Sequence, residues 1–309
     1  MEGSELSGEL VARSHEMNIL KTRLEKAIAG SGGTLLISGE AGIGKTRLAM
    51  ELLGYAKSRK VKILSGRAVP HNFTPYLVFV DALEDMFAIE PKDASPTRLR
   101  KITQAIRRVA PEIIEVMPVI GDVMKVGRVA IREYKEFKME PMARKQQLLD
   151  SVTHLILKIS TSQPILIILD DLQWADPSSF GLLHYLARNM RSAHALILGT
   201  YRIEELEEQV GGKPTLLDTL RFMRSEDLVE EITLGRLGKT EVKTLLNALL
   251  YGDAPEQLVN AIYLGTEGNP LFIIETLKLL VEDKVLVRVD GSWTLSKPIE
   301  RVTIPGRVR

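Results

Sequence analysis

Residues 39–46 read Gly39-Glu-Ala-Gly-Ile-Gly-Lys-Thr46 and match the pattern Gly-x-x-x-x-Gly-Lys-Ser/Thr in full. Glycines let the backbone wrap a phosphate with its N–H groups pointing inward, and the following helix offers its positive N-terminus to the same group. Lys45 can reach the β- and γ-phosphates of a nucleotide, and the Thr46 hydroxyl can ligate Mg²⁺. A short apolar run, Thr34-Leu-Leu-Ile-Ser38, precedes the match, and a helical pattern follows it. This order of strand, glycine-rich turn and helix predicts a phosphate-binding loop.

Four further apolar runs have the character of buried strands. They are Val61-Lys-Ile-Leu-Ser65, Ile165-Leu-Ile-Ile-Leu169, Ala195-Leu-Ile-Leu-Gly199 and Glu231-Ile-Thr-Leu234. These runs are short, mostly apolar on both faces, and separated by stretches with helical periodicity. That pattern is typical of a parallel sheet covered by helices on each side. The sequence therefore predicts an α/β fold.

Acidic residues follow one of these runs directly. Asp170 and Asp171 come after Leu169, and acids at the end of a buried strand are costly unless a positive charge meets them. A magnesium nucleotide would do so, with Asp170 making an outer-sphere contact to the metal and Asp171 orienting or polarising an attacking water. The alternative is that both acids cap the next helix. Asp176 stands directly before a Pro-Ser pair, so we expect it to cap a helix.

A polar end also follows the run at 195–199, which continues as Thr200-Tyr-Arg202. Ligands gather at the carboxyl ends of parallel strands, so Arg202 is expected to point toward a γ-phosphate. The alternative is a surface arginine that begins the loop before the acidic run at 204–208.

Composition narrows the classes of function. The 309 residues include 41 Lys and Arg against 40 Asp and Glu, five His and no Cys, so disulfides and cysteine metal sites are excluded. A net charge of +1 gives no general attraction to nucleic acid or membranes. The histidines lack metal-ligand spacing. Acids stand near the N-terminus, where a signal peptide carries bases, and apolar runs are short. We therefore expect a soluble, cytoplasmic chain that makes no membrane contact.

One segment is distinctly basic. Residues 98–147 hold twelve Lys and Arg against six Asp and Glu. This excess suits either a docking surface for an acidic partner or the solvated faces of helices, and the interspersed acids favour the second interpretation.

The pattern of the sequence changes after Leu237. Three helical patterns follow, at 239–250, 255–264 and 270–281, and a hairpin is predicted from 284–288 and 292–295 around Asp290-Gly291. We expect an α/β nucleotide-binding domain over residues 9–236 and a helical lid subdomain with a terminal hairpin over residues 237–309.

Together these motifs resemble the nucleotide-binding core of STAND proteins, the signal-transduction ATPases with numerous domains of the AAA+ class, over roughly residues 9–309. Leu10-Val-Ala-Arg-Ser-His-Glu16 is similar to their N-terminal element, with Ala12 where glycine is usual. Asp170-Asp-Leu-Gln-Trp-Ala-Asp176 resembles their extended Walker B motif, and Thr200-Tyr-Arg202 their sensor 1. Glu267-Gly-Asn-Pro-Leu-Phe272 is similar to the GxP element of the lid.

The resemblance implies a three-layer P-loop NTPase core with a C-terminal helical lid, and ATP or ADP with Mg²⁺ as its ligands. The catalytic residues that it and the motifs imply are Lys45, Asp171 and Arg202, and the metal ligands are Thr46 and Asp170. Nucleotide binding would involve Val11, Arg13, Gly39, Glu40, Ala41, Gly42, Ile43, Gly44, Lys45, Thr46, Arg47 and Pro270, with Pro270 against the adenine.

The implied function is a molecular switch. ADP would hold a closed form, ATP an open and self-associating one, and slow ATP hydrolysis would reset the switch. In the family a winged-helix domain follows the lid, and Val302-Thr-Ile-Pro305 resembles the linker before it. We therefore expect a piece of a longer protein, with a protein or small-molecule signal acting through further domains and no direct binding of nucleic acid here. The alternatives are a DNA-linked AAA+ ATPase of the origin-recognition or loader type, and a scaffold that retains ADP without turnover.

Overall fold

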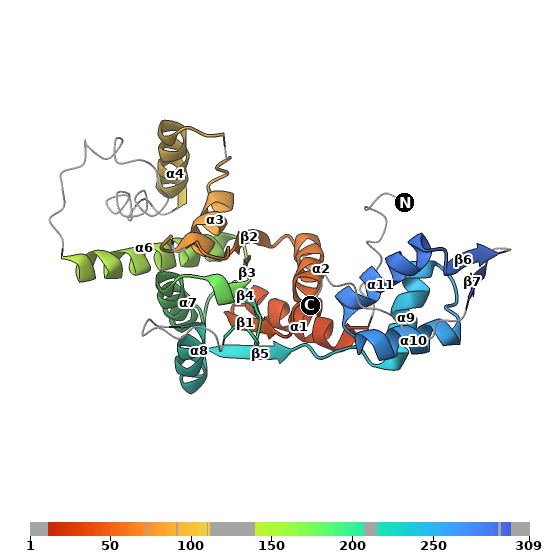
Figure 1. Cartoon of the computed structure of the whole chain (residues 1–309). Helices are drawn as coiled ribbons and strands as arrows, with labels where there is room; N and C mark the ends of the chain where they lie inside the picture. The colour runs from red at the N-terminus through yellow and green to blue at the C-terminus, as the bar shows by residue number, and fades with distance from the viewer. Residues whose placement is uncertain are drawn as a thin grey trace. The chain divides into compact units, whose positions relative to one another are not determined.

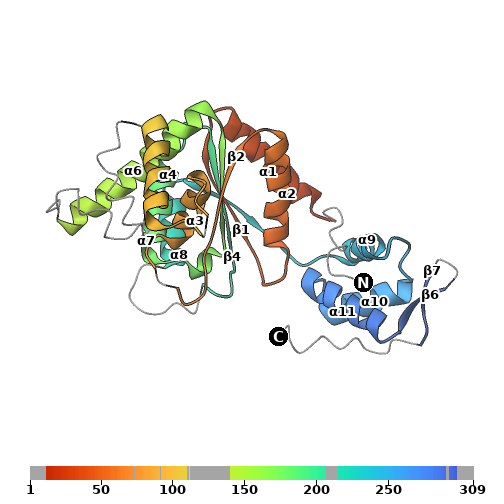
Figure 2. The same ribbon diagram turned by 90° about the horizontal axis from the view of Figure 1, so that it is seen from above.

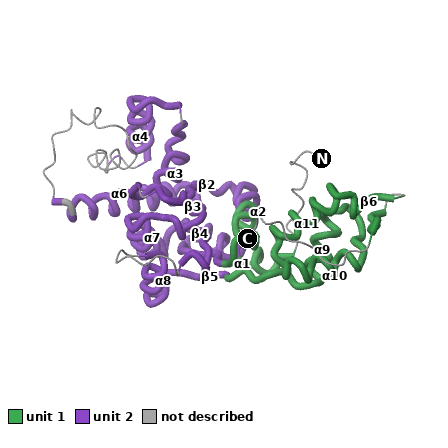
Figure 3. Tube along the Cα trace, viewed as in Figure 1, with its two compact units in different colours: residues 1–19, 39–51, 233–309 green, residues 20–38, 52–232 purple. Residues whose placement is uncertain are grey.

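A computed structural model describes residues 12–72, 74–90, 92–109, 111, 140–206, 215–289 and 292–297 (Figure 1). The predictions for Val11, the Asp290-Gly291 turn and the linker at 302–305 lie outside these residues. The chain divides into two compact units (Figure 3). Unit 1 comprises residues 1–19, 39–51 and 233–309, and unit 2 comprises residues 20–38 and 52–232. The boundary expected near residue 237 stays a prediction.

Unit 2 is built on a five-stranded sheet with the order β2-β3-β4-β1-β5. Its strands are β1 Gly33–Ser38, β2 Lys62–Arg67, β3 Ile165–Asp170, β4 Ala195–Tyr201 and β5 Val229–Thr233. The pairs β2–β3, β3–β4 and β4–β1 are parallel. Every residue of β1 and β4 is buried, because their side chains are covered on both faces of the sheet. The five predicted strands are thus confirmed, with ends shifted by one or two residues.

Helices cover both faces of this sheet, so the predicted three-layer α/β fold is confirmed (Figure 2). The parts of α1 (Ser14–Ile28) and α2 (Lys45–Ser58) that belong to unit 2 lie on one face. The other face carries α3 Leu77–Met86, α4 Ser95–Val109, α6 Pro141–Ser162, α7 Pro177–Asn189 and α8 Leu216–Ser225, which share one apolar core. A 3-10 turn, η2, runs over Leu172–Trp174 after β3.

The described part of the basic segment is helical. Helix α4 packs against α6 and buries Ile102 and Ile106 completely. Arg100, Arg107 and Arg108 lie on its exposed side. This arrangement is that of an amphipathic helix with a solvated basic face.

Unit 1 contains the C-terminal helices α9 Lys239–Leu250, α10 Glu256–Thr266 and α11 Pro270–Glu282. They surround an apolar core that includes Leu246, Ile262 and Ile273. The strands β6 Leu286–Val289 and β7 Ser292–Leu295 pair antiparallel, which confirms the predicted hairpin. The Trp293 indole N–H donates to the Leu250 carbonyl at 2.8 Å and ties the hairpin to α9.

Asp176 caps α7, as the sequence predicts. Its Oδ1 accepts the backbone N–H groups of Ser178 at 2.9 Å and Ser179 at 3.1 Å, and its Oδ2 accepts the Ser179 hydroxyl at 2.5 Å. Asp176→Ala leaves these buried donors without an acceptor, so we expect the free energy of unfolding to fall by about 1–3 kcal/mol. Asp176→Asn keeps an acceptor at the cap and should lose under about 1 kcal/mol. Urea unfolding followed by circular dichroism measures both; equal losses would contradict the capping role.

Candidate functional site

The glycine-rich loop adopts backbone conformations that favour glycine. The φ angle is +149° at Gly39, +74° at Gly42 and +105° at Gly44. A Cβ atom at Gly39 would lie 2.8 Å from the Leu234 carbonyl oxygen, and one at Gly42 would lie 2.6 Å from the Leu271 Cβ. The loop therefore depends on glycine both for its turn and for its close packing. These features fit the predicted phosphate cradle.

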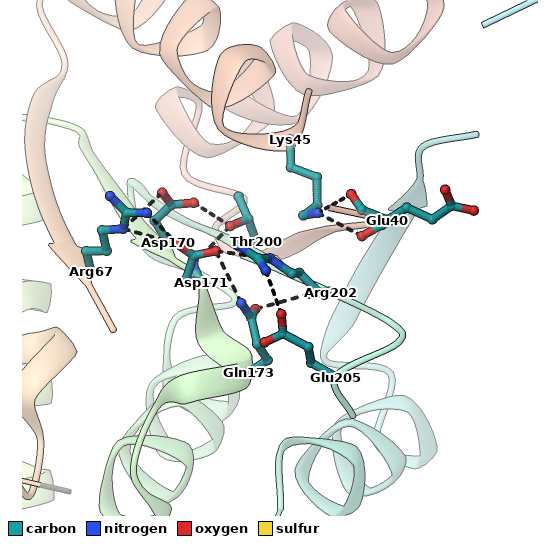
Figure 4. A network of polar contacts seen from close by, with 10 residues as sticks. Glu40, Lys45, Arg67, Asp170, Asp171, Gln173, Thr200, Arg202 and Glu205 are labelled. Atoms are coloured by element: carbon teal, nitrogen blue, oxygen red, sulfur yellow. Dashed lines mark hydrogen bonds and ion pairs between the residues drawn. The ribbon is translucent and has the colours of Figure 1, made fainter. Parts of the chain in front are cut away.

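Lys45 is the first residue of α2 and is 6% exposed. Its Nζ donates to the carbonyl oxygens of Gly39 at 2.7 Å and Glu40 at 2.8 Å (Figure 4). The ammonium thus lies within the loop that the sequence predicts to hold phosphate. Thr46 and Arg47 follow on the exposed side of the helix, where Arg47 forms an i,i+4 ion pair with Glu51 at 2.7 Å.

The GxP-like element contacts the same loop within unit 1. The Asn269 Nδ2 donates to the Ala41 carbonyl at 3.0 Å, while its Oδ1 accepts the Leu271 N–H and caps α11. The Leu271 N–H also lies 3.2 Å from the Gly42 carbonyl oxygen. Pro270 is the first residue of α11, next to this capping residue. Asn269 therefore links the glycine-rich loop to the start of α11.

A second link between the loop and this element is ionic. The Arg236 guanidinium contacts the Glu40 carboxylate at 2.9 Å and also pairs with Glu267. Hydrogen bonding to Glu40 is the main cause that raises the pKa of Arg236 above its ordinary value. All three side chains are substantially exposed, so these two ion pairs contribute little to the stability of the fold.

The described part of the N-terminal element, residues 12–16, belongs to unit 1. Ala12 has a φ of +61°, a left-handed conformation that glycine adopts without strain. This conformation is compatible with the glycine that the family resemblance leads us to expect at this position. Arg13 donates to Glu16 at 3.0 Å and to the Gly235 carbonyl at 2.5 Å.

The two acids after β3 lie in unit 2 and differ in their surroundings (Figure 4). Asp170 Oδ1 accepts the Thr200 hydroxyl at 2.5 Å, and its side chain is partly exposed. Asp171 is 5% exposed and left-handed, with a φ of +57°. Its backbone N–H donates to the Thr200 Oγ1 at 3.1 Å. Thr200 therefore fixes both acids, and Asp171 does not cap a helix with its side chain.

Arg67 is a partner of Asp171 that the sequence patterns do not predict. Its Nε and Nη2 donate to the Asp171 Oδ2 at 3.1 and 2.8 Å. The hydrogen bonds to Asp171 are the main cause that raises the pKa of Arg67 above its ordinary value, and the two side chains form an ion pair at 2.8 Å. Arg67 ends β2 and lies directly opposite Asp170 in the β2–β3 register. In the sequence, Arg67 can be recognised as a basic residue close to the end of a predicted strand. Only the order of the strands in the sheet places it beside the acids.

Gln173 joins Asp171 to Arg202. It is fully buried, and its Nε2 donates to the Asp171 Oδ1 at 3.2 Å while its Oε1 accepts the Arg202 backbone N–H at 3.1 Å. The Arg202 guanidinium pairs with Glu205 at 2.6 Å and lies 4.8 Å from the centre of the Trp174 ring. Its Nε is 3.9 Å from the Asp171 Oδ1. Arg202 is thus held in a polar network rather than left at the surface.

The structure therefore brings the predicted residues together in two groups. Unit 1 holds the glycine-rich loop with Arg13 and the start of α11, and unit 2 holds Asp170, Asp171 and Arg202. Within the described residues, no group of three or more His, Cys, Asp or Glu could hold a metal on its own. The assignment of Thr46 and Asp170 as Mg²⁺ ligands therefore stays a prediction.

A parallel sheet with a complete phosphate loop after β1, acids after β3 and an arginine after β4 defines a P-loop NTPase fold. Residues 9–198, more than half of the chain, match the family described as AAA ATPase domain. The chain belongs to this family, which confirms the AAA-type core expected from its motifs.

Three similar proteins illustrate the range of relatives. Hybrid signal transduction histidine kinase G of Dictyostelium discoideum is 26% identical over 183 residues, which cover 59% of this chain and 5% of that protein. A STAND protein with a tetratricopeptide repeat sensor from Pyrococcus horikoshii is 17% identical with a TM-score of 0.41, covering 88% of this chain and 31% of its own. The structure of Drosophila ORC bound to DNA is 13% identical with a TM-score of 0.50, and the match covers 92% of this chain and 59% of that chain.

The chain spans a small part of the first two of these proteins. At such identities, the similarity to the solved structures concerns the fold alone. Among the described residues, the helices are too short or too polar to cross a membrane.

Proposed function

We propose that this chain is the ATP- and ADP-binding switch module of a STAND-type signalling ATPase, and that it hydrolyses ATP slowly. The observation that carries the proposal is the register of β1 against β4. Ser38 lies opposite Tyr201, so the two strands end level, and the next residues in the chain are Gly39 of the phosphate loop and Arg202. Ligands of parallel α/β sheets bind at such strand ends.

Each residue has a distinct role in this proposal. The loop backbone and Lys45 bind the phosphates, while Arg13 and Pro270 contribute to the adenine site. Thr46 and Asp170 would hold Mg²⁺, which would supply charge neutralisation at the phosphates. Asp171 orients the attacking water. Arg202 senses the γ-phosphate.

The signalling role is supported by the motif resemblance and by a relative whose name includes signal transduction. A switch requires that a ligand bind two states with different affinity. ATP differs from ADP by one phosphoryl group, so a residue that meets only that group can supply the difference. We propose that ADP favours a closed monomer and ATP an open form that self-associates.

The first test is to denature the purified chain and identify any released nucleotide by chromatography. The second is to measure the mass in solution by light scattering with ADP or with a non-hydrolysable ATP analogue. Bound ADP together with a larger mass in the ATP analogue supports the switch. A chain that neither carries nor binds nucleotide would overturn it. ATP turnover that rises with added duplex DNA would favour the DNA-linked alternative instead.

Asn269 offers a separate prediction. Asn269→Ser keeps a capping oxygen for α11 but removes the amide that donates to the Ala41 carbonyl. Because the Ala41 carbonyl then loses its hydrogen-bond donor and the loop is held less firmly, we expect the Kd for ADP to rise about 3- to 10-fold. Isothermal titration calorimetry measures this. Asn189→Ser removes a similar amide-to-carbonyl bond on α7 and should leave the Kd unchanged. Equal effects of both variants would contradict the loop-orienting role.

A further inference from the structure

We propose that Glu205 is an internal competitor for the γ-phosphate at Arg202, and that it thereby sets the preference of this chain for ATP over ADP. This inference rests on the proposed function. Glu205 Oε1 lies 2.6 Å from Arg202 Nη1, and both side chains are about three-quarters covered, at 25% and 26% exposure (Figure 4). The Glu205 carboxylate thus already binds the guanidinium that we propose as the ligand of the terminal phosphate.

The local fold holds this pair in place. A turn closes after β4, where the Leu206 N–H donates to the Ile203 carbonyl at 3.2 Å, and it directs Glu205 back toward Arg202. Trp174 covers one face of the guanidinium at 4.8 Å, and the bond from the Arg202 N–H to Gln173 fixes the backbone. The pair is therefore more ordered than a fully exposed ion pair, whose two side chains lose entropy on meeting.

The chemistry makes the competition specific. Arginine N–H groups bind carboxylate and phosphate oxygens alike, so the Nη1 group that donates to Glu205 Oε1 at 2.6 Å can serve either anion. ADP carries no terminal phosphoryl group and leaves the Arg202–Glu205 pair intact. In this proposal the γ-phosphate of ATP replaces Glu205 at Nη1 of Arg202. The pair therefore weakens the binding of ATP and leaves the binding of ADP unchanged, which is the differential effect that a switch requires.

The test compares two affinities in one variant. Glu205→Gln keeps the size of the side chain and removes its charge. With Mg²⁺ present, we expect the Kd for the non-hydrolysable analogue AMPPNP to fall about 3- to 10-fold and the Kd for ADP to change less than about twofold. Glu204→Gln removes a charge from the neighbouring position and should move neither Kd. Calorimetry with each variant gives the ratio of the two values.

The outcomes separate this inference from the proposed function. A wild-type chain that binds neither nucleotide overturns both. Normal binding with an unchanged ratio in Glu205→Gln overturns the inference and leaves the switch module standing, and so does an equal shift in Glu204→Gln.

A second measurement needs no substitution at Glu205. The chain has two tryptophans, so Trp293→Phe leaves Trp174 as the only one. Arg202 stacks on Trp174, so release of Glu205 and movement of the guanidinium should change its fluorescence. We expect AMPPNP to change the emission and ADP to leave it near the nucleotide-free value. An identical response to the two nucleotides would overturn the inference even where Glu205→Gln fails to fold.

Discussion

Lys45→Ala is expected to abolish nucleotide binding at micromolar concentrations. The Lys45 ammonium is buried in the glycine-rich loop, and a phosphate in that loop would be its charge partner. Removing one partner of a buried, hydrogen-bonded charge pair costs about 2–4 kcal/mol, which corresponds to a Kd raised roughly 30- to 700-fold. Lys45→Arg should also bind poorly, because the planar guanidinium does not replace a compact ammonium in a tight loop.

The control for this prediction is Lys57→Ala, which removes an exposed lysine from the same helix. It should bind ADP and ATP with wild-type affinity in calorimetry. Lys45 also satisfies the carbonyls of Gly39 and Glu40, so thermal unfolding of Lys45→Ala must be recorded to separate lost binding from a lost fold. A folded Lys45→Ala chain with unchanged affinity would refute the assignment of the loop.

The strands could be predicted because their residues are apolar on both faces. A run such as Ile165–Leu169 is too short for a typical helix and too apolar for a loop, and its neighbours in sequence are helical. The glycine-rich loop could be predicted because its chemistry requires glycine at fixed spacing. The structure confirms the requirement for glycine at Gly42, where a Cβ atom would clash with Leu271.

The partners of the acids could not be predicted in this way. Arg67 is 104 residues away from Asp171 in sequence, and only the pairing of β2 with β3 brings them together. Gln173 stands two residues after Asp171, yet its role depends on a turn that aims its amide at both Asp171 and Arg202. Local patterns state which residues are polar, whereas strand order and backbone conformation decide which polar residues meet.

Asp171→Asn is expected to slow phosphate release about 10²- to 10⁴-fold while changing the Kd for ATP and ADP less than about threefold, because a positioned base contributes that much to a reaction rate. Asparagine has the shape of aspartate and tolerates the left-handed φ of +57° at this position. The bond from its backbone N–H to Thr200 and an acceptor for Gln173 both remain. The variant therefore removes the negative charge that would polarise a water and leaves the local fold intact.

Asp176→Asn is the matched control, because it neutralises another buried acid in the same unit that caps a helix. We expect its turnover to stay within about twofold of wild type. The rate of phosphate release under saturating ATP measures both variants. Wild-type turnover in Asp171→Asn would mean that Asp171 serves to neutralise Arg67, since both guanidinium bonds go to its Oδ2. In that case Arg67→Met should likewise leave turnover at the wild-type level, because it removes the same ion pair.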